Sequence, residues 1–286
     1  MAGRAQAAYA KAAAYARAGL RAMTLDLAQY LLGALSGLLV GYTLGLVGGG
    51  GSILAVPLMV YLVGVSNPHI AIGTSALAVA ANAATGLLHH ARAHTVKWRF
   101  GVLYAAAGVV GAVGGSSLGK AVNGQKLLFL FALLMIGIGA LMLRHRNHEG
   151  LEEAQGGWKN APKVLGFGFG TGILSGFFGI GGGFLIVPGL IAATRMPMLN
   201  AVGTSLVAVT AFGLTTASNY ALSGLVDWGL AFDFILGGLL GGMLGAASAQ
   251  RLAANRGRLT MVFSGLIFAV ALYMLWRSGA AILHHA

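Results

Sequence analysis

The residues best suited to chemistry are two glycine runs, because each can present free backbone N–H groups to an anion. The two runs comprise Gly48, Gly49, Gly50, Gly51 and Ser52, and Gly179, Gly181, Gly182 and Gly183. Consecutive glycines do not sustain a helix, since each costs about 1 kcal/mol relative to alanine. A helix broken inside a membrane exposes N–H groups, and its dipole favours an anion there. A tight reversal or close helix contact is the alternative.

Hydroxyl and amide side chains follow each run and extend the candidate substrate site. A Gly-Thr-Ser triplet follows each run, and one asparagine lies further along each half. These donors are Thr74, Ser75, Asn82, Thr204, Ser205 and Asn219. Serine and threonine near helix starts also cap helices, and asparagine also bonds neighbouring helices, so both alternatives stay open.

Other chemistry finds little support in the chain. Neither glycine run is followed by the Lys-Ser/Thr of a nucleotide-binding loop. His89, His90 and His94 lie beside Arg92 and Lys97, which is typical of a solvated basic loop rather than a metal site. The chain has no cysteine, and its apolar segments show no nucleophile–base pair. We therefore expect no catalytic residues, no metal and no cofactor.

The two glycine runs belong to a longer repeated pattern. Pro57 and Pro188, which follow the runs, are separated by 131 residues, whereas Trp98 and Trp228 are separated by 130. The glycine runs with their prolines, the Gly-Thr-Ser triplets and the Val-x-Trp motifs thus recur at a nearly constant spacing. This recurrence predicts two homologous halves.

The composition indicates a membrane protein. Hydrophobic residues make up 57% of the chain and charged residues 8%, against roughly 25% charged in soluble proteins. The net charge of +12 comes from basic residues between apolar runs, as the positive-inside rule predicts, and does not indicate nucleic-acid binding. We expect an all-α polytopic membrane protein whose partners are a small anionic substrate and the lipid bilayer. A homodimer is left open.

The apolar segments number five in each half. The second of each five is short: Ile53–Val65 would rise roughly 20 Å as a helix, against about 30 Å of hydrocarbon, and Phe184–Ala193 is shorter still. We expect 8–10 transmembrane segments, with one glycine-broken short helix in each half. The expected divisions are a basic cytoplasmic or interfacial segment 1–24, a first membrane repeat 25–143, a polar linker 144–162, a second membrane repeat 163–276 and a tail 277–286.

Charge counting favours one topology. If the short segments do not cross, 12 of the 18 Lys and Arg residues lie on the cytoplasmic side with both termini and loops 90–99, 144–163 and 223–227. If all ten segments cross, the split is 11 to 7 and the N-terminus lies outside. The rule favours eight spans with both termini cytoplasmic. Whether the halves are parallel or inverted is left open.

The order of these motifs resembles that of the sulfite exporter TauE/SafE family of bacterial membrane permeases. The matching features are the glycine-rich stretches that lead to Pro57 and Pro188, the Gly-Thr-Ser triplets, and the Val-x-Trp motifs that end at Trp98 and Trp228. The resemblance covers nearly all of residues 25–276. It implies transport of sulfite, sulfonates or related sulfur oxyanions and organic anions across a bacterial inner membrane.

The residues alone favour only a small anion held near broken helices. We expect a permease that works by alternating access, with its site between the two repeats. A passive anion channel and a permease for an unrelated small organic anion are the alternatives.

Overall fold

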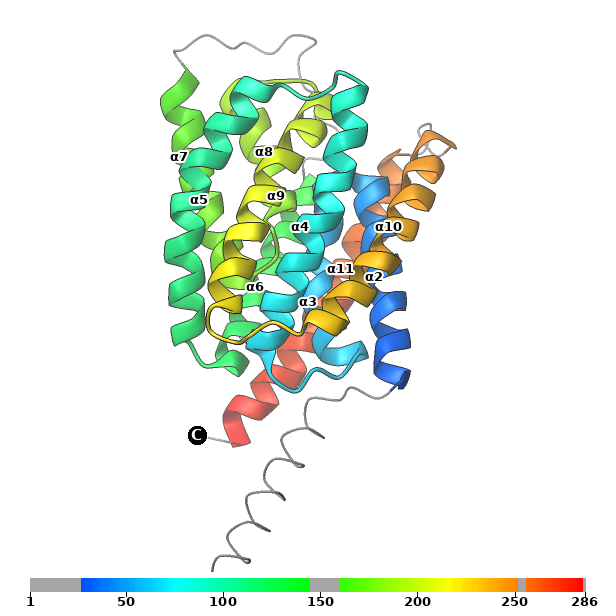
Figure 1. Cartoon of the computed structure of the whole chain (residues 1–286), viewed down its shortest axis with the longest axis vertical. Coiled ribbons are helices and arrows are strands. Elements are labelled where there is room, and N and C mark those ends of the chain that lie inside the picture. The colour runs from blue at the N-terminus through cyan, green and yellow to red at the C-terminus, as the bar shows by residue number, and fades with distance from the viewer. Residues whose placement is uncertain (1–26, 145–159, 252–255, 285–286) are drawn as a thin grey trace, which may run out of the picture.

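The computed structural model describes residues 27–144, 160–251 and 256–284, and within these ranges every regular element is a helix (Figure 1). The first half contains α2 (Leu27–Val47), a 3-10 segment η1 (Gly48–Leu54), α3 (Ala55–Pro57), a π turn η2 (Leu58–Leu62), α4 (Pro68–Arg92), α5 (Trp98–Ala121) and α6 (Gly124–Arg144). The second half contains α7 (Ala161–Phe178), α8 (Gly183–Thr194), α9 (Met198–Ala221), α10 (Trp228–Arg251) and α11 (Arg256–His284).

Length and composition make this an all-α polytopic membrane protein. Seven helices among the described residues are long and apolar enough to cross a bilayer, and two further apolar helices, Gly51–Leu62 and Gly183–Thr194, are shorter. The expected segment 1–24 and most of the expected linker lie outside the described residues.

Each short segment runs back along the helix before it. Gln29, near the start of α2, donates its side-chain amide to the carbonyl of Val63, just after η2, at 3.2 Å. Similarly, Gly189 in α8 lies beside Phe167, in the first half of α7. Both short segments therefore carry the chain back in the opposite direction.

The central helices α4 and α9 are antiparallel. Thr74, near the start of α4, accepts a hydrogen bond from Asp227, which lies after the end of α9. Thr204, near the start of α9, accepts one from Lys97, which lies after the end of α4. Since these helices occupy matching places in the sequence, the two halves have opposite orientations (Figure 1).

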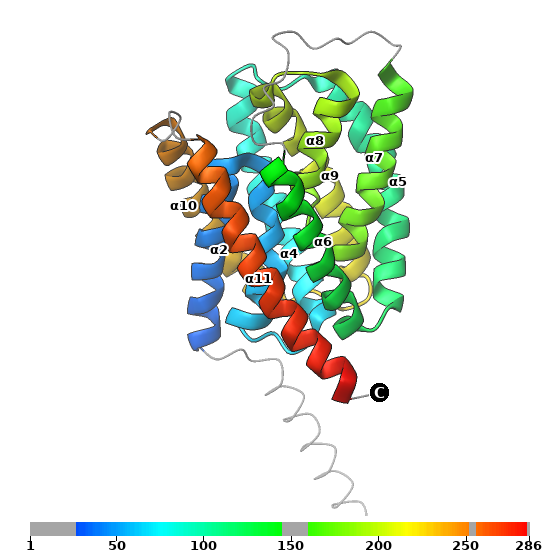
Figure 2. The ribbon, with the colours of Figure 1, turned by 180° about the vertical axis from the view of Figure 1, so that it is seen from behind.

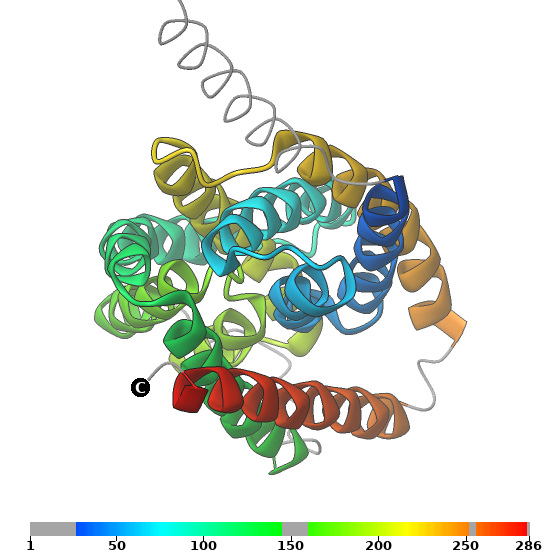
Figure 3. The same ribbon diagram turned by 90° about the horizontal axis from the view of Figure 1, so that it is seen from below.

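The helix pairs follow the same pattern in both halves. Helix α2 packs against α10, as α7 packs against α5, while α6 packs against α11 along one edge of the bundle (Figures 2 and 3). A Cβ atom on Gly41 would overlap the carbonyl of Gly238, and one on Gly172 would overlap that of Gly108. Small residues allow such close contact between membrane helices. Each half therefore packs one of its helices against a helix of the other half in the same way, as a duplicated chain would. The duplication itself stays a prediction.

The topology expected from charge counting is wrong. It placed loops 90–99 and 223–227 on one side, but Lys97 and Asp227 lie at opposite ends of the α4–α9 pair. The error arose from treating the short segments as if they did not carry the chain across. If all ten segments cross, 11 Lys and Arg residues lie on the side of the linker and 7 on the side of the termini. The positive-inside rule then favours a cytoplasmic linker and not cytoplasmic termini. Which side faces the cytoplasm stays a prediction.

Candidate functional site

The second glycine run forms a left-handed loop between α7 and α8. Three of its glycines have positive φ angles, of 68° at Gly179, 64° at Gly181 and 67° at Gly182. Residues with a Cβ atom adopt this conformation only at a cost of roughly 1–2 kcal/mol. Glycine therefore allows α7 to end at Phe178 and α8 to begin at Gly183 inside the bundle.

This loop gathers backbone N–H groups at the start of α8. Gly179 donates to the carbonyl of Ser175 at 2.8 Å, and the first bonds of α8 run from Leu185 and Ile186 to the carbonyl of Gly182. Among the short backbone bonds outside the helices, none in the described part of the chain begins at the amides of residues 180–184, and residues 179, 181 and 182 lie in hydrogen-bonded turns. We call the amides of residues 180–184 the cradle. They lie at a helix N-terminus, where the dipole favours an anion.

A buried hydroxyl lies beside the cradle. Ser175 is fully buried, and its Oγ has no hydrogen-bond partner among the described residues. This Oγ is 3.1 Å from the position that a Cβ atom on Gly182 would occupy. Leaving a buried hydroxyl unpaired costs about 1–3 kcal/mol, so a bound ligand would relieve that cost. The sequence analysis missed Ser175, although a serine one turn before a glycine run in an apolar segment was the available signal.

Both halves contribute to the walls of the cradle. Ile72 of α4 packs against Gly179, and Val79 of the same helix packs against Gly181. Val209 of α9 also contacts the Gly181 position, at 3.1 Å from an ideal Cβ. The cradle therefore lies where the two central helices meet.

The first glycine run has a different structure. Gly48, Gly49, Gly50 and Gly51 belong to the 3-10 segment η1, which follows α2 without a break. A Cβ atom on Gly51 would overlap the backbone nitrogen of Leu44, so this glycine permits close contact with α2. Ser52 is fully buried. A substrate-binding role for this run stays a prediction.

The Gly-Thr-Ser triplets join the two halves. The Thr74 Oγ1 accepts from the Asp227 amide at 3.0 Å, and the Thr204 Oγ1 accepts from the Lys97 amide at 2.9 Å. These two bonds form a reciprocal clamp between each half and the loop of the other. The adjacent serines donate within their own helices, Ser75 to Ile72 at 3.1 Å and Ser205 to Val202 at 2.7 Å. The structure thus gives all four hydroxyls partners inside the protein.

The two asparagines have different environments. Asn82 is 4% exposed, and neither atom of its side-chain amide has a partner in the described residues. It packs directly on Gly238 of α10. Asn219 lies near the end of α9, where its Oδ1 accepts from Lys120 at 2.8 Å and its Nδ2 donates to Ser116 at 2.6 Å. Asn219 therefore links α9 to α5 and is not part of the cradle.

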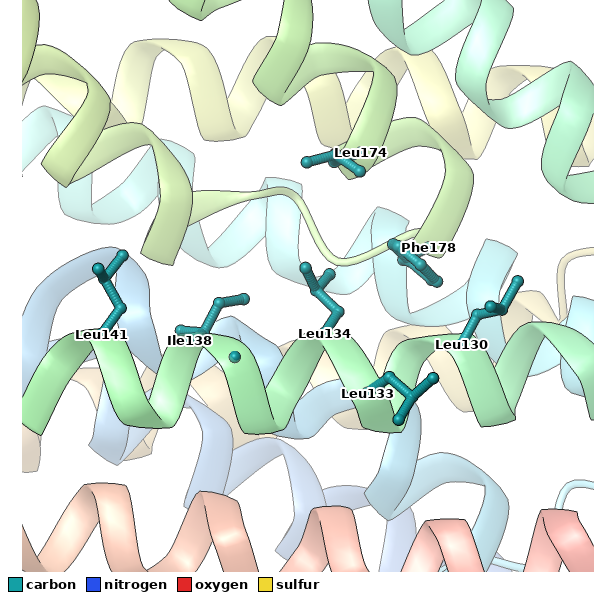
Figure 4. Close-up of a pocket in the computed structure, with 8 residues that line it drawn as sticks. Leu130, Leu133, Leu134, Ile138, Leu141, Leu174 and Phe178 are labelled. Carbon is teal, nitrogen blue, oxygen red and sulfur yellow. The ribbon is translucent and has the colours of Figure 1, made fainter.

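An apolar groove of about 540 Å³ lies between α6 and α7 (Figure 4). It is lined by Leu130, Leu133, Leu134, Gly137, Ile138, Leu141, Leu174 and Phe178. None of these side chains can bind an anion. Within the described ranges, no cluster of His, Asp or Glu is arranged to hold a metal ion.

Comparison with known proteins gives a consistent classification. A family model described as "Sulfite exporter TauE/SafE" matches residues 33–274. A "Probable membrane transporter protein" of Xylella fastidiosa (strain 9a5c) is 54% identical over 248 residues, covering 86% of this chain and 95% of its own length. The "Probable membrane transporter protein YunE" of Bacillus subtilis (strain 168) is 29% identical, covering 76% and 87% respectively. No solved structure matches the chain.

Proposed function

Because the chain belongs to the sulfite exporter TauE/SafE family of membrane transporters, we propose that it carries a small oxyanion, such as sulfite or a sulfonate, bound at the cradle. The observation that carries this proposal is the buried hydroxyl of Ser175, unpartnered among the described residues, beside the amides of the glycine loop at the N-terminus of α8. Together they can donate hydrogen bonds to a charged oxygen, and the atoms nearest to the Cβ positions of Gly179, Gly181 and Gly182 include no carboxylate.

The chemistry of these donors suits transport rather than permanent binding. A buried Arg or Lys would hold an anion tightly and would cost several kcal/mol to place in the bilayer. Backbone amides and one hydroxyl distribute the attraction over several weaker contacts, which allows release. Since the cradle touches both α4 and α9, a relative movement of the two halves would open it to one side of the membrane at a time.

The test is the loss of the Ser175 hydroxyl. We expect Ser175→Ala to lower the apparent affinity for sulfite in reconstituted vesicles by roughly tenfold, because a hydrogen bond to a charged group contributes about 1.5–3 kcal/mol. The folded protein should lose no stability, since this hydroxyl has no partner in the protein.

Ser264→Ala provides the matched control. Ser264 is likewise fully buried with an unpartnered hydroxyl, but it belongs to α11. This variant should transport sulfite as the parent does. Equal kinetics in both variants would remove Ser175 from the site. Flux that does not saturate with sulfite concentration would indicate a channel instead of a carrier.

A further inference from the structure

A second polar cluster lies near the ends of α5 and α9, on the side of the bundle where α4 begins. Lys120, in the last turn of α5, donates its ammonium to the carbonyl of Asn219 at 2.9 Å and to the Oδ1 of Asn219 at 2.8 Å. A third bond runs to the hydroxyl of Ser223 at 2.8 Å. All three acceptors come from the other half of the chain.

The Lys120 ammonium is hydrogen-bonded to neutral oxygens in the described part of the chain. Each of its hydrogen bonds within the described part of the chain goes to a carbonyl, an amide or a hydroxyl. The acid nearest in sequence to its partner Ser223 is Asp227, whose carboxylate accepts from the Leu230 amide at the start of α10. Charge-assisted bonds to an anion are roughly twice as strong as bonds to neutral groups. An oxyanion would therefore compete well for this ammonium.

An unused hydroxyl lies beside Lys120. Tyr220 is fully buried, and its hydroxyl has no partner among the described residues. The ring centre of Tyr220 is 5.9 Å from the Lys120 Nζ. Its hydroxyl is 3.2 Å from where a Cβ atom on Gly119, the neighbour of Lys120, would lie. The unpartnered hydroxyl thus belongs to a ring that lies close to the Lys120 ammonium.

This region adjoins the cradle. The Gly119 position also contacts the carbonyl of Phe177, two residues before the glycine loop. On the other side, Ile72 packs on Gly179 while its neighbour Gly73 packs on Tyr220. Tyr220 is therefore separated from the glycine loop by Ile72 and Gly73 on one side and by Gly119 and Phe177 on the other.

We propose that Lys120 and Tyr220 form a second, transient binding site for the same class of small oxyanion, between the cradle and the end of the bundle where α4 begins. This inference rests on the proposed function. The anion takes the place of the Asn219 and Ser223 oxygens on the Lys120 ammonium and accepts from the Tyr220 hydroxyl. That exchange also releases the bonds that hold α5 to α9, so binding loosens the contact between the halves at this end.

The kinetic test compares two lysines at the same end of the bundle. We expect Lys120→Gln to raise the sulfite concentration for half-maximal uptake by roughly tenfold, from the loss of a charged hydrogen bond. Lys126 is exposed in the first turn of α6, and Lys126→Gln should leave uptake unchanged. An equal effect of both substitutions would indicate only general attraction of anions and would overturn the site.

The Tyr220→Phe variant tests the hydroxyl separately. The Nδ1 of His69 is also buried and unpartnered, and its ring centre is 6.3 Å from that of Tyr220. If the hydroxyl serves an anion, Tyr220→Phe should weaken sulfite uptake without lowering the thermal unfolding midpoint. If the hydroxyl instead pairs with His69, the midpoint should fall while uptake affinity is kept, which would overturn the proposed role of Tyr220.

Direct location of an anion separates this inference from the proposed function. Crystals of the full chain soaked in selenite, a sulfite analogue, should show anomalous selenium peaks at the cradle and beside Lys120, the latter absent from Lys120→Gln. Because the chain has no cysteine, selenite has no thiol to oxidise. A peak at the cradle alone would overturn the Lys120 site and keep the proposed function. A peak beside Lys120 alone would keep the Lys120 site and overturn binding at the cradle. The absence of any peak would overturn both sites.

Discussion

The two glycine runs are nearly identical in composition but differ in structure. Gly48–Leu54 continues α2 as a 3-10 segment, so its amides are used by its own helical turns. Residues 179–182 form a loop with three left-handed glycines, which separates α7 from α8 and places the amides of residues 180–184 at a helix N-terminus. Where the first run has Gly49, the second has Ile180, whose side chain is fully buried in the core. The aligned position of Ser175 is occupied by Leu44 in the first half.

This difference shows that similar halves need not contribute equally to a site. The helix pairs and the threonine clamp are shared by both halves, and they build the scaffold. The left-handed loop and the unpartnered hydroxyl of Ser175 occur in the second half, while the first half supplies Ile72 and Val79 as walls. The proposed anion site is therefore asymmetric within an arrangement of matching helices.

The largest expected effect comes from placing a Cβ atom in each run. Gly51→Ala would overlap the backbone nitrogen of Leu44 and approach the carbonyl carbon of Thr43 to 2.6 Å. Since backbone atoms cannot move aside cheaply, we expect a stability loss of about 3 kcal/mol. Gly181→Ala should cost about 1–2 kcal/mol for its left-handed angle, yet abolish sulfite uptake by distorting the cradle. Thermal unfolding and vesicle uptake measure the two effects.

Gly224→Ala isolates the cost of the backbone angle. Gly224 has a φ of 68°, and no atom lies within 4 Å of the Cβ position. The Gly224→Ala variant should lose about as much stability as Gly181→Ala but should still transport sulfite as the parent does. If Gly224→Ala and Gly181→Ala lower uptake equally, the conformation of the second run has no special role.

A smaller effect is expected from the clamp that the halves share. Thr74→Val and Thr204→Val each remove the acceptor of a partly buried backbone amide, that of Asp227 or of Lys97. We expect each to lower the free energy of unfolding by about 1–2 kcal/mol. Because the two bonds are equivalent, the two losses should match within about 0.5 kcal/mol. A large inequality, measured by denaturant unfolding in micelles, would show that the halves are held together unequally.

The fold class could be predicted from apolar run lengths, because the bilayer fixes how many residues a span needs. The opposite orientation of the halves could not, since it depends on whether the short segments carry the chain across. The bond from Gln29 to Val63 shows this for the first half. The sequence marked the second glycine run but gave no sign that Gly48–Gly51 would stay helical. It also could not show that Thr74 and Thr204 are satisfied by distant amides, because those partners are 153 and 107 residues away.

The halves also differ at one matching position, which is Asn82 in the first half and Phe212 in the second. Substitutions here should give the smallest changes in stability. These residues match in the sequence and pack on the matching glycines Gly238 and Gly108. Asn82 has no hydrogen-bond partner in the described residues, so Asn82→Leu should leave the protein equally stable or more stable by about 1 kcal/mol. We expect this variant to transport sulfite more slowly, since an unpaired amide within the central helix α4 contributes more to ligand binding than to stability. Phe212→Leu, in contrast, should lower stability by about 1 kcal/mol with little change in apparent sulfite affinity. Unchanged transport by Asn82→Leu would make Asn82 a purely structural residue and confine the asymmetry to the glycine loop and Ser175.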